Sequence, residues 1–294
     1  MIKLSIKDLP PLGKILLLTC IMLGCSIIAI VLWGLFSDGS LVSLKWMQVV
    51  QSVFVFILPC IICCYLWTDQ PWKWLKLTNW PHAWPIILTI LLFVCGIPFI
   101  NLLSYWNEQL RLPAFMADIE AWMQAAEANA GNLTEQFLQD SNYAGLLFNL
   151  FIMAISPALS EEIFFRGTLQ PLLGEKHHPH IAIWSTAILF SAIHMQFYGF
   201  IPRMLLGAVL GYTVYWSKSL WLGIIGHAVN NGMAVISYFA ANRLNYNAQF
   251  LDQLGTGTTL WLGIVSGICV GALLYALRRS LTISNASSRN SSGN

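Results

Sequence analysis

The chain has 294 residues and a formal net charge of only +2; 57% of its residues are hydrophobic and 10% are charged. Because soluble domains carry about 25% charged residues, this composition and the mean hydropathy of +0.65 exclude an ordinary soluble protein. The small net charge gives no sign of a nucleic-acid partner. The expected fold class is all-α: a polytopic transmembrane helical bundle surrounded by membrane lipid.

Eight segments are apolar enough to cross a bilayer, which takes about 20 helical residues. The first has 22 residues, which is too long for the apolar region of a cleavable signal peptide, about 7–15 residues, so it is predicted to be a span. The fifth and sixth are short, and the boundary between them is poorly defined. The predicted spans are Ile15–Phe36, Met47–Trp67, Trp84–Tyr105, Tyr143–Phe165, Ile181–Phe197, Phe200–Trp216, Leu220–Ala241 and Thr259–Leu277.

Basic residues predict the orientation, because cytoplasmic loops are enriched in Lys and Arg. With the N-terminus inside, ten basic residues fall on the cytoplasmic side and three, Lys45, Arg111 and Arg243, on the other. Arg166 and Arg203 lie at predicted helix ends and are not counted. Both termini are therefore predicted to be cytoplasmic, in a bacterial inner membrane, since nothing in the loops suggests a eukaryotic protein. The ten are Lys3, Lys7, Lys14, Lys73, Lys76, Lys176, Lys218, Arg278, Arg279 and Arg289.

The chain divides into three predicted parts. Residues 1–142 hold three spans and an acidic extracytoplasmic loop, and residues 143–280 form the intramembrane core. Residues 281–294 form a cytoplasmic tail, rich in Ser and Asn, that is predicted to be disordered. Within the loop 106–142, an Ala- and Glu-rich stretch predicts a surface helix, which is either a solvated cap or a gate over a site.

Small residues recur inside the predicted spans. The glycines of Gly207-x-x-x-Gly211 and Gly263-x-x-x-Gly267-x-x-x-Gly271 predict ridges that let helices pack closely. All seven cysteines lie in apolar runs and are interpreted as packing residues rather than disulfides or metal ligands.

Ionisable side chains gather in the second half of the chain at membrane depth. Such a group costs roughly 2.5 kcal/mol or more in the bilayer and by default marks a functional site. Glu161 and Glu162 lie near the end of the fourth span, His194 ends an apolar run in the fifth, and His227 and Asn231 share one face of the seventh. If these helices converge, Glu161, His194, His227 and Asn231 surround one polar cavity.

Helical spacing separates the two acids. Glu162 and Arg166 are four residues apart and can pair, whereas Glu161 is rotated by about 100° and is left to face the cavity. A carboxylate near an imidazole can deprotonate water, and a second His with an Asn can stabilise an oxyanion. Alternatively, Glu161, His194 and His227 could hold a zinc ion with an open water position. The predicted cofactor is therefore none or one zinc ion.

Each of these features has a simpler explanation when taken alone. A single intramembrane histidine such as His194 is often a hydrogen-bond partner between helices, and an acidic pair can be a proton relay or a folding clamp. Their combination in neighbouring spans favours catalysis. Two other classes remain as alternatives: a non-catalytic membrane immunity or scaffold protein, and a proton-coupled transporter, which the lack of an internal repeat disfavours.

Three ordered motifs carry a resemblance to a known family. Glu161-Glu162-Ile163-Phe164-Phe165-Arg166 has the pattern Glu-Glu-x-x-x-Arg, Phe190-Ser191-Ala192-Ile193-His194 has Phe-x-x-x-His, and His227-Ala228-Val229-Asn230-Asn231 has His-x-x-x-Asn. The chain over residues 143–237 resembles the CAAX-protease and bacteriocin-processing family of intramembrane proteases. The resemblance implies an eight-helix bundle whose site opens to the cytoplasmic side. The predicted orientation, which places Glu161 near the cytoplasmic end of its span, agrees with this.

The resemblance also implies an activity, an endopeptidase that acts on a membrane-associated protein or peptide. Glu161 would activate water with help from His194, and His227 and Asn231 would stabilise the oxyanion. The supporting residues would be Glu162, Arg166 and Phe190. Both metal-dependent and metal-free glutamate mechanisms are argued for this family, so the resemblance leaves the metal open. It also leaves open the substrate, its lipidation and the oligomeric state.

Overall fold

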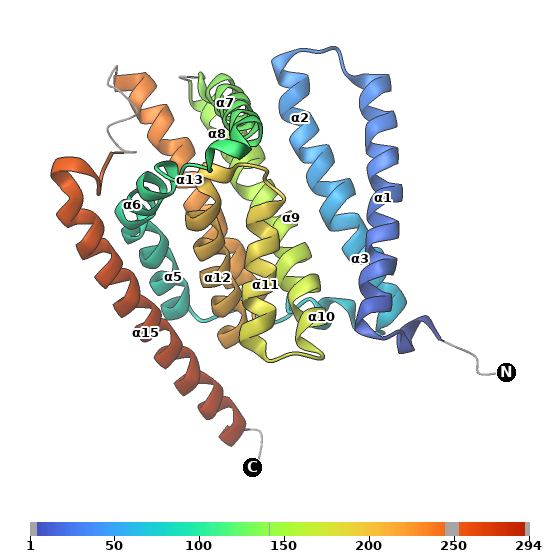
Figure 1. The fold of residues 1–294 in the computed structure, drawn as a ribbon. Helices are drawn as coiled ribbons and strands as arrows, with labels where there is room; N and C mark the ends of the chain where they lie inside the picture. The colour runs from blue at the N-terminus through green and yellow to red at the C-terminus, as the bar shows by residue number, and fades with distance from the viewer. Residues whose placement is uncertain (1–4, 141, 245–252, 292–294) are drawn as a thin grey trace.

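The computed structural model describes residues 5–140, 142–244 and 253–291, and this part of the chain is a helical bundle without strands (Figure 1). Six helices are long and apolar enough to cross a membrane. A seventh span is the pair α5 (Ala83–Cys95) and α6 (Ile97–Glu108), which is bent by 42°. The helix α11 (Pro179–Ala192) is also apolar but shorter, and the predicted all-α polytopic bundle is confirmed.

Several spans are assembled from consecutive helical segments. π-Helical segments interrupt the second and fourth spans without ending them, so that Leu41–Trp67 and Tyr143–Gly174 each run as one span. The helices other than those named above are α1 (Pro11–Phe36), α2 (Leu41–Gln51), α3 (Leu58–Trp67), α4 (Pro71–Trp74), α7 (Ala117–Leu138), α8 (Tyr143–Asn149), α9 (Ser156–Glu162), α10 (Gln170–Gly174), α12 (Phe200–Ser217), α13 (Leu220–Leu244) and α15 (Leu260–Ser291).

The fourth span is longer than the sequence predicts. It ends at Gly174 rather than at Phe165, because the polar residues that follow are buried and bonded. Arg166 Nη2 donates to the carbonyl oxygen of Gly207 at 2.9 Å, and Gln170 Nε2 donates to that of Gly211 at 3.2 Å. Partners on α12 thus let the helix continue through polar residues, and Glu161 lies within the span rather than at its end.

The fifth span is shorter than the sequence predicts. α11 has 14 residues and ends at Ala192 rather than at Phe197, so it is about 21 Å long, less than the roughly 30 Å of the hydrocarbon core. Met195, in the turn that follows, has a left-handed φ of 54°. Figure 1 shows α11 ending below the level of α7. The turn after α11 therefore lies inside the depth of the bundle, at the level that His194 needs to approach Glu161.

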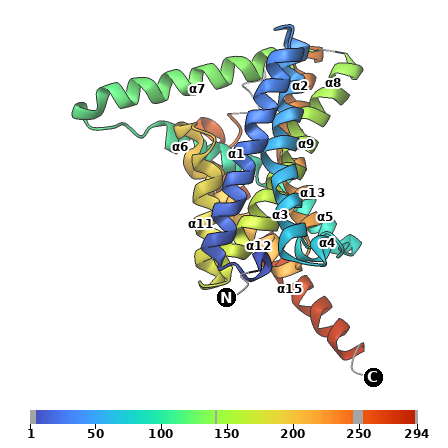
Figure 2. The same cartoon turned by 90° about the vertical axis from the view of Figure 1, so that its right-hand side faces the viewer.

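The surface helix predicted in the loop 106–142 is present as α7. It lies across one end of the bundle, almost perpendicular to the spans (Figure 2). Its C-terminal end is fixed by two amides, because Asn149 Nδ2 donates to the Phe137 oxygen at 2.9 Å and Asn242 Nδ2 to the Leu138 oxygen at 2.8 Å. This attachment makes α7 part of the bundle rather than a detached cap.

The last helix and its glycines differ from the prediction in two respects. α15 continues to Ser291, beyond the point at which a disordered tail was expected, and residues 292–294 lie outside the described part. A Cβ on Gly263 would lie 2.7 Å from the Gly255 oxygen, and one on Gly267 would lie 3.0 Å from Phe99, whereas Gly271 faces open space. Two of the three glycines in this predicted ridge thus lie in close contacts, and the third does not. All seven cysteines are free.

The two ends of the bundle differ in charge. α1 begins and α15 ends at the same end, where the α3–α5, α10–α11 and α12–α13 connections also lie, and α7 lies at the opposite end (Figure 1). Those connections carry Lys73, Lys76, Lys176 and Lys218, whereas the connection before α7 carries Arg111. The basic residues thus favour a cytoplasmic location for the end with the termini.

The orientation predicts which face of the membrane exposes each end. Phe115, before α7, is 85% exposed, and Lys176, after α10, is also exposed. We expect a membrane-impermeant maleimide to label Phe115→Cys in intact spheroplasts, and Lys176→Cys only after the membrane is opened. The unsubstituted protein, with its seven cysteines, gives the background. The reverse labelling pattern would show that the termini lie outside.

Candidate active site

The acidic pair lies between two irregular segments of the fourth span. The π-helical segment Leu150–Ile155 directly precedes Pro157, whose missing N–H interrupts regular helical hydrogen bonding. A second π-helical segment, Ile163–Leu169, follows Glu162. π turns are frequent at functional sites because they rotate the side chains that follow them. Glu161 and Glu162 thus lie on a short α-helical stretch with a π-helical segment at each end.

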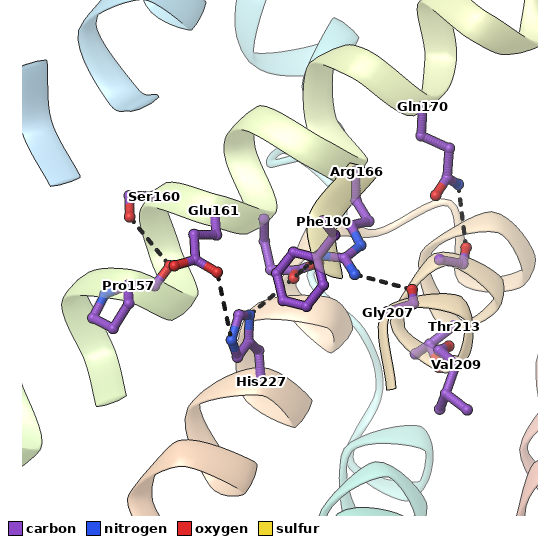
Figure 3. Close-up of polar contacts among 12 residues, drawn as sticks. Pro157, Ser160, Glu161, Arg166, Gln170, Phe190, Gly207, Val209, Thr213 and His227 are labelled. Carbon is purple, nitrogen blue, oxygen red and sulfur yellow. Dashed lines mark hydrogen bonds and ion pairs between the residues drawn. The ribbon is translucent and has the colours of Figure 1, made fainter. Parts of the chain in front are cut away.

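Glu162 and Arg166 form a fully buried ion pair, as their spacing predicts. Arg166 Nη1 lies 2.5 Å from Glu162 Oε1, and both side chains are 0% exposed. Arg166 also donates to Gly207, and its guanidinium carbon lies 4.6 Å from the centre of the Phe190 ring (Figure 3). The pair therefore joins the fourth span to α11 and α12.

Glycines on the neighbouring helices make room for these side chains. A Cβ on Gly223 would lie 2.8 Å from Glu162 Oε2, and one on Gly211 would lie 2.8 Å from Gln170 Oε1. A Cβ on Gly207 would lie 3.1 Å from the Phe190 ring. The ridge of Gly207 and Gly211, predicted to pack helices, thus packs polar side chains against backbone carbonyl groups.

His227 lies between the two acids. Its Nδ1 is 3.0 Å from Glu162 Oε1 and its Nε2 is 3.9 Å from Glu161 Oε2 (Figure 3). Because Glu162 Oε1 already accepts from Arg166, it is a charged acceptor, and Nδ1 carries the donated hydrogen. Glu161 Oε2 is buried and accepts no hydrogen bond from the described residues. Nε2 of His227 and this oxygen therefore face each other across a narrow gap.

His194 is oriented by the helix that it ends. Its Nδ1 lies 2.7 Å from the Phe190 carbonyl oxygen, an acceptor only, so Nδ1 donates and Nε2 keeps its lone pair. The Phe190 ring centre lies 5.1 Å from the His194 ring and 5.7 Å from the His227 ring. Phe190 thus packs against both imidazoles and against Arg166, which explains its place at the centre of the site.

One cavity of about 450 Å³ brings the predicted residues together. Glu161, His194, His227 and Asn231 all line it. Asn231 Oδ1 accepts from Asn230 Nδ2 at 3.2 Å, an orientation that leaves the Asn231 amide hydrogens for another acceptor. A carboxylate, two imidazoles and an amide around one cavity can activate a water molecule and bind a developing negative charge.

The cavity also has a charged residue that the sequence analysis set aside. Arg203, in the first turn of α12, lines it together with Gln196 and Asn230. The sequence contains a usable signal, an arginine three residues into an otherwise apolar helix, since such a charge in a membrane usually faces a cavity.

The cavity is closed toward the end that carries the termini. On α13 its lining begins at His227, and on the fourth span it stops at Glu161. Beyond these residues lie the Glu162–Arg166 pair and an apolar cluster that includes Leu75 and Leu220. At the other end the cavity reaches Thr134 and Leu138 of α7.

This direction conflicts with one expectation from the resemblance. A site that opens to the cytoplasm and two cytoplasmic termini cannot both hold, because the cavity and the termini are at opposite ends of the bundle. The expected position of Glu161, near the cytoplasmic end of its span, is also wrong, because the helix continues to Gly174. The predicted span ended at Phe165, just before the charged Arg166, whereas the helix continues past it.

The donors for a metal ion are present but are not gathered into a ligand set. Among the described residues, no three His, Cys, Asp or Glu side chains are grouped closely enough to hold a metal. Both imidazoles nevertheless have the outer hydrogen-bond partners that metal ligands use, Glu162 for His227 and the Phe190 carbonyl for His194. Even so, Glu161, His194 and His227 do not form a ready metal centre.

Comparison with known proteins identifies the segment that holds the site. A family model described as type II CAAX prenyl endopeptidase Rce1-like matches residues 143–233. This match confirms the resemblance to the CAAX-protease family over the segment that contains the acidic pair, both histidines and Asn231, and it implies a protease. Among curated proteins and among solved structures, nothing matches the chain.

The buried pair predicts coupled effects on stability. Glu162→Ala or Arg166→Ala leaves a buried charge without its partner, a loss of about 3–5 kcal/mol, so each variant should melt at a clearly lower temperature in detergent. The double variant should be less destabilised than the sum of the two single variants.

A peripheral ion pair provides the matched control. Lys14 and Glu175, near the start of α1 and after α10, are 3.5 Å apart, with side chains 14% and 39% exposed. Replacing either with Ala should change stability by less than about 1 kcal/mol. Strictly additive losses at Glu162 and Arg166 would show that their contact does not stabilise the protein.

Proposed function

We propose that this protein is an intramembrane endopeptidase that hydrolyses a peptide bond with a water molecule activated by Glu161. One observation carries the proposal: the buried Glu161 Oε2 has no hydrogen-bond partner among the described residues and faces a cavity lined by His194, His227 and Asn231. An unpaired carboxylate oxygen in such a place is costly unless a water molecule or a substrate completes it.

The first chemical step is the attack of water. Glu161 takes a proton from the water, and His194 Nε2, which keeps its lone pair, accepts a hydrogen bond that orients the same water. The oxygen of the water forms a bond to the carbonyl carbon of the peptide, and the carbonyl π electrons move to its oxygen.

The second step stabilises the resulting oxyanion and breaks the peptide bond. The amide of Asn231 and a protonated His227 donate hydrogen bonds to the oxyanion. His227 can hold this proton because its Nδ1–H is bonded to the Glu162 carboxylate. Glu161 then returns its proton to the leaving nitrogen, which departs as an amine.

Glu162, Arg166 and Phe190 have supporting roles in this proposal. Arg166 balances the charge of Glu162, so that Glu161 is not placed beside a second uncompensated carboxylate. Phe190 holds the two imidazoles and the guanidinium by ring contacts of 4.6–5.7 Å. Phe190 also lines the cavity, whereas Glu162 and Arg166 lie behind it and hold His227 and α12 through their hydrogen bonds.

The substrate is a membrane-associated protein or peptide, which reaches the cavity from the end covered by α7. If the basic residues set the orientation, that end faces away from the cytoplasm, and the protein lies in a bacterial inner membrane with both termini inside. α7 then acts as the gate that sequence analysis offered as one reading of this loop, because Thr134 and Leu138 line the cavity.

The base is tested by Glu161→Gln. The amide keeps the shape of the side chain but cannot take a proton from water, so hydrolysis should fall by about 10²–10⁴-fold or more. The measurement compares uncut membrane proteins, by quantitative proteomics, in cells with the unsubstituted and the variant protein, followed by hydrolysis of the accumulated protein by each purified form.

Glu135→Gln on α7 is the matched control, because Glu135 is exposed and does not line the cavity. It should leave hydrolysis unchanged. Full activity of purified, folded Glu161→Gln protein would exclude Glu161 as the base, and normal function in cells without any hydrolysis would favour an immunity or scaffold protein.

Removal of metal tests whether hydrolysis needs a metal ion, given that the described residues form no ready ligand set. If Glu161 and the histidines work without a metal, protein treated with a chelator should retain its hydrolytic activity and contain far less than one metal ion per chain by elemental analysis. A single zinc ion whose loss and return track activity would instead show that the cavity rearranges around a metal, with water as the fourth ligand.

A further inference from the structure

The cavity contains a cation without an ion-pair partner. Arg203 Nη1 donates to the carbonyl oxygen of Gln196 at 3.1 Å and Nη2 to Gln196 Oε1 at 2.9 Å. Both acceptors are neutral. The ion pairs found among the described residues do not include Arg203. Its positive charge is therefore held in place by neutral acceptors, with no carboxylate of the described residues at ion-pair distance.

The turn between α11 and α12 is built to hold this guanidinium. A Cβ on Gly199 would lie 2.9 Å from Arg203 Nη2, so glycine leaves the space that the group occupies. Asn107 fixes the same turn at two points, because its Nδ2 donates to the Phe197 oxygen at 2.9 Å and its Oδ1 accepts from the Ile201 N–H at 3.1 Å. Arg203 thus has a fixed position before any ligand arrives.

Glu127 and Glu161 act on the charge of Arg203 from a distance, but neither forms an ion pair with it. Glu161 lines the same cavity but faces His227 at 3.9 Å, and Glu127 of α7 accepts from the Tyr198 N–H at 3.3 Å. An arginine at membrane depth is costly without a counter-charge, and its planar group binds a carboxylate through two parallel hydrogen bonds. Two of its five N–H groups serve Gln196, which leaves three for a ligand.

We propose that Arg203 binds a carboxylate of the substrate and so makes this site selective for apolar peptide segments that carry one nearby negative charge. The apolar part of the segment would lie against Leu206, Ala234 and Val235, which line the same cavity. The carboxylate comes either from the C-terminus of the peptide or from an Asp or Glu side chain. This inference rests on the proposed function, because it takes the cavity to be the place where the peptide lies.

Binding in the absence of hydrolysis tests the inference. Glu161→Gln protein serves as the background, and the probe is an N-terminally dansylated apolar pentapeptide in three forms: the free acid, the C-terminal amide, and the amide with one internal Glu. We expect one of the two charged forms to bind at least about tenfold more tightly than the neutral amide. Whichever form it is identifies the source of the carboxylate.

The variants assign this preference to Arg203. Arg203→Gln in the same background should remove the preference, and Arg203→Lys should keep part of it, because Lys retains the charge but not the planar donor pair. Arg278→Gln, which removes a charge from α15 far from the cavity lining, should keep all of it. Melting temperatures show whether each variant is folded.

Two outcomes would overturn the inference: equal binding of the three peptides, or an undiminished preference in Arg203→Gln protein. The comparison of the three peptides decides the question even where Arg203→Gln fails to fold. An Arg203-dependent preference in a protein that hydrolyses nothing would contradict the proposed function alone. Hydrolysis without a carboxylate preference would contradict this inference alone.

Discussion

The site depends on one interaction, the buried pair of Glu162 and Arg166. A single oxygen, Glu162 Oε1, lies 2.5 Å from Arg166 Nη1 and 3.0 Å from His227 Nδ1. Through these contacts and the bond from Arg166 to Gly207, the pair connects the fourth span to α12 and α13. Removing either partner would leave a charge in a place where no water is available to solvate it. The helices that carry the site are thus fixed by the same charges that define it.

The pair also explains how two adjacent acids can have different roles. Rotation along the helix turns Glu162 toward Arg166 and turns Glu161 toward the cavity. Because Arg166 compensates Glu162, Glu161 does not lie beside a second uncompensated carboxylate, which favours its role as a base. Pro157 and the π-helical segments Leu150–Ile155 and Ile163–Leu169 adjust the helix on both sides of this turn. These irregular backbone segments thus help to set the directions in which Glu161 and Glu162 point.

Contacts between residues close in the sequence could be predicted, whereas the ends of the spans, which depend on distant residues, were predicted less well. The spacing of Glu162 and Arg166 predicts their contact, because residues four apart on a helix are neighbours regardless of what surrounds them. The ends of spans depend on partners far away in sequence. Arg166 and Gln170 are tolerated inside a helix only because Gly207 and Gly211 supply carbonyl acceptors, and hydropathy alone shows neither carbonyl.

The depth of His194 could not be predicted from the sequence for the same reason, and the signal that Arg203 offers was missed. His194 reaches the site because α11 ends at Ala192 and the turn with Met195 is tight, whereas the apolar run continues to Phe197. Arg203 was set aside as a residue at a helix end, and its importance follows from the cavity that it faces. The three motifs indicated which residues matter, but the direction in which the cavity opens required the packed helices.

The pair that builds the site also determines from which side a substrate can reach it. Glu162, Arg166 and the apolar cluster around Leu75 fill the bundle between the cavity and the end with the termini. A substrate that entered through that end would have to separate Glu162 from Arg166. His227, which is bonded to Glu162, would then lose its position. In the proposed function a substrate comes past α7, whose surface is acidic, toward a cavity in which Arg203 has no ion pair with a described residue. A carboxylate is repelled at the surface of α7 and attracted inside the cavity, so a peptide that enters with its apolar part first avoids the unfavourable step.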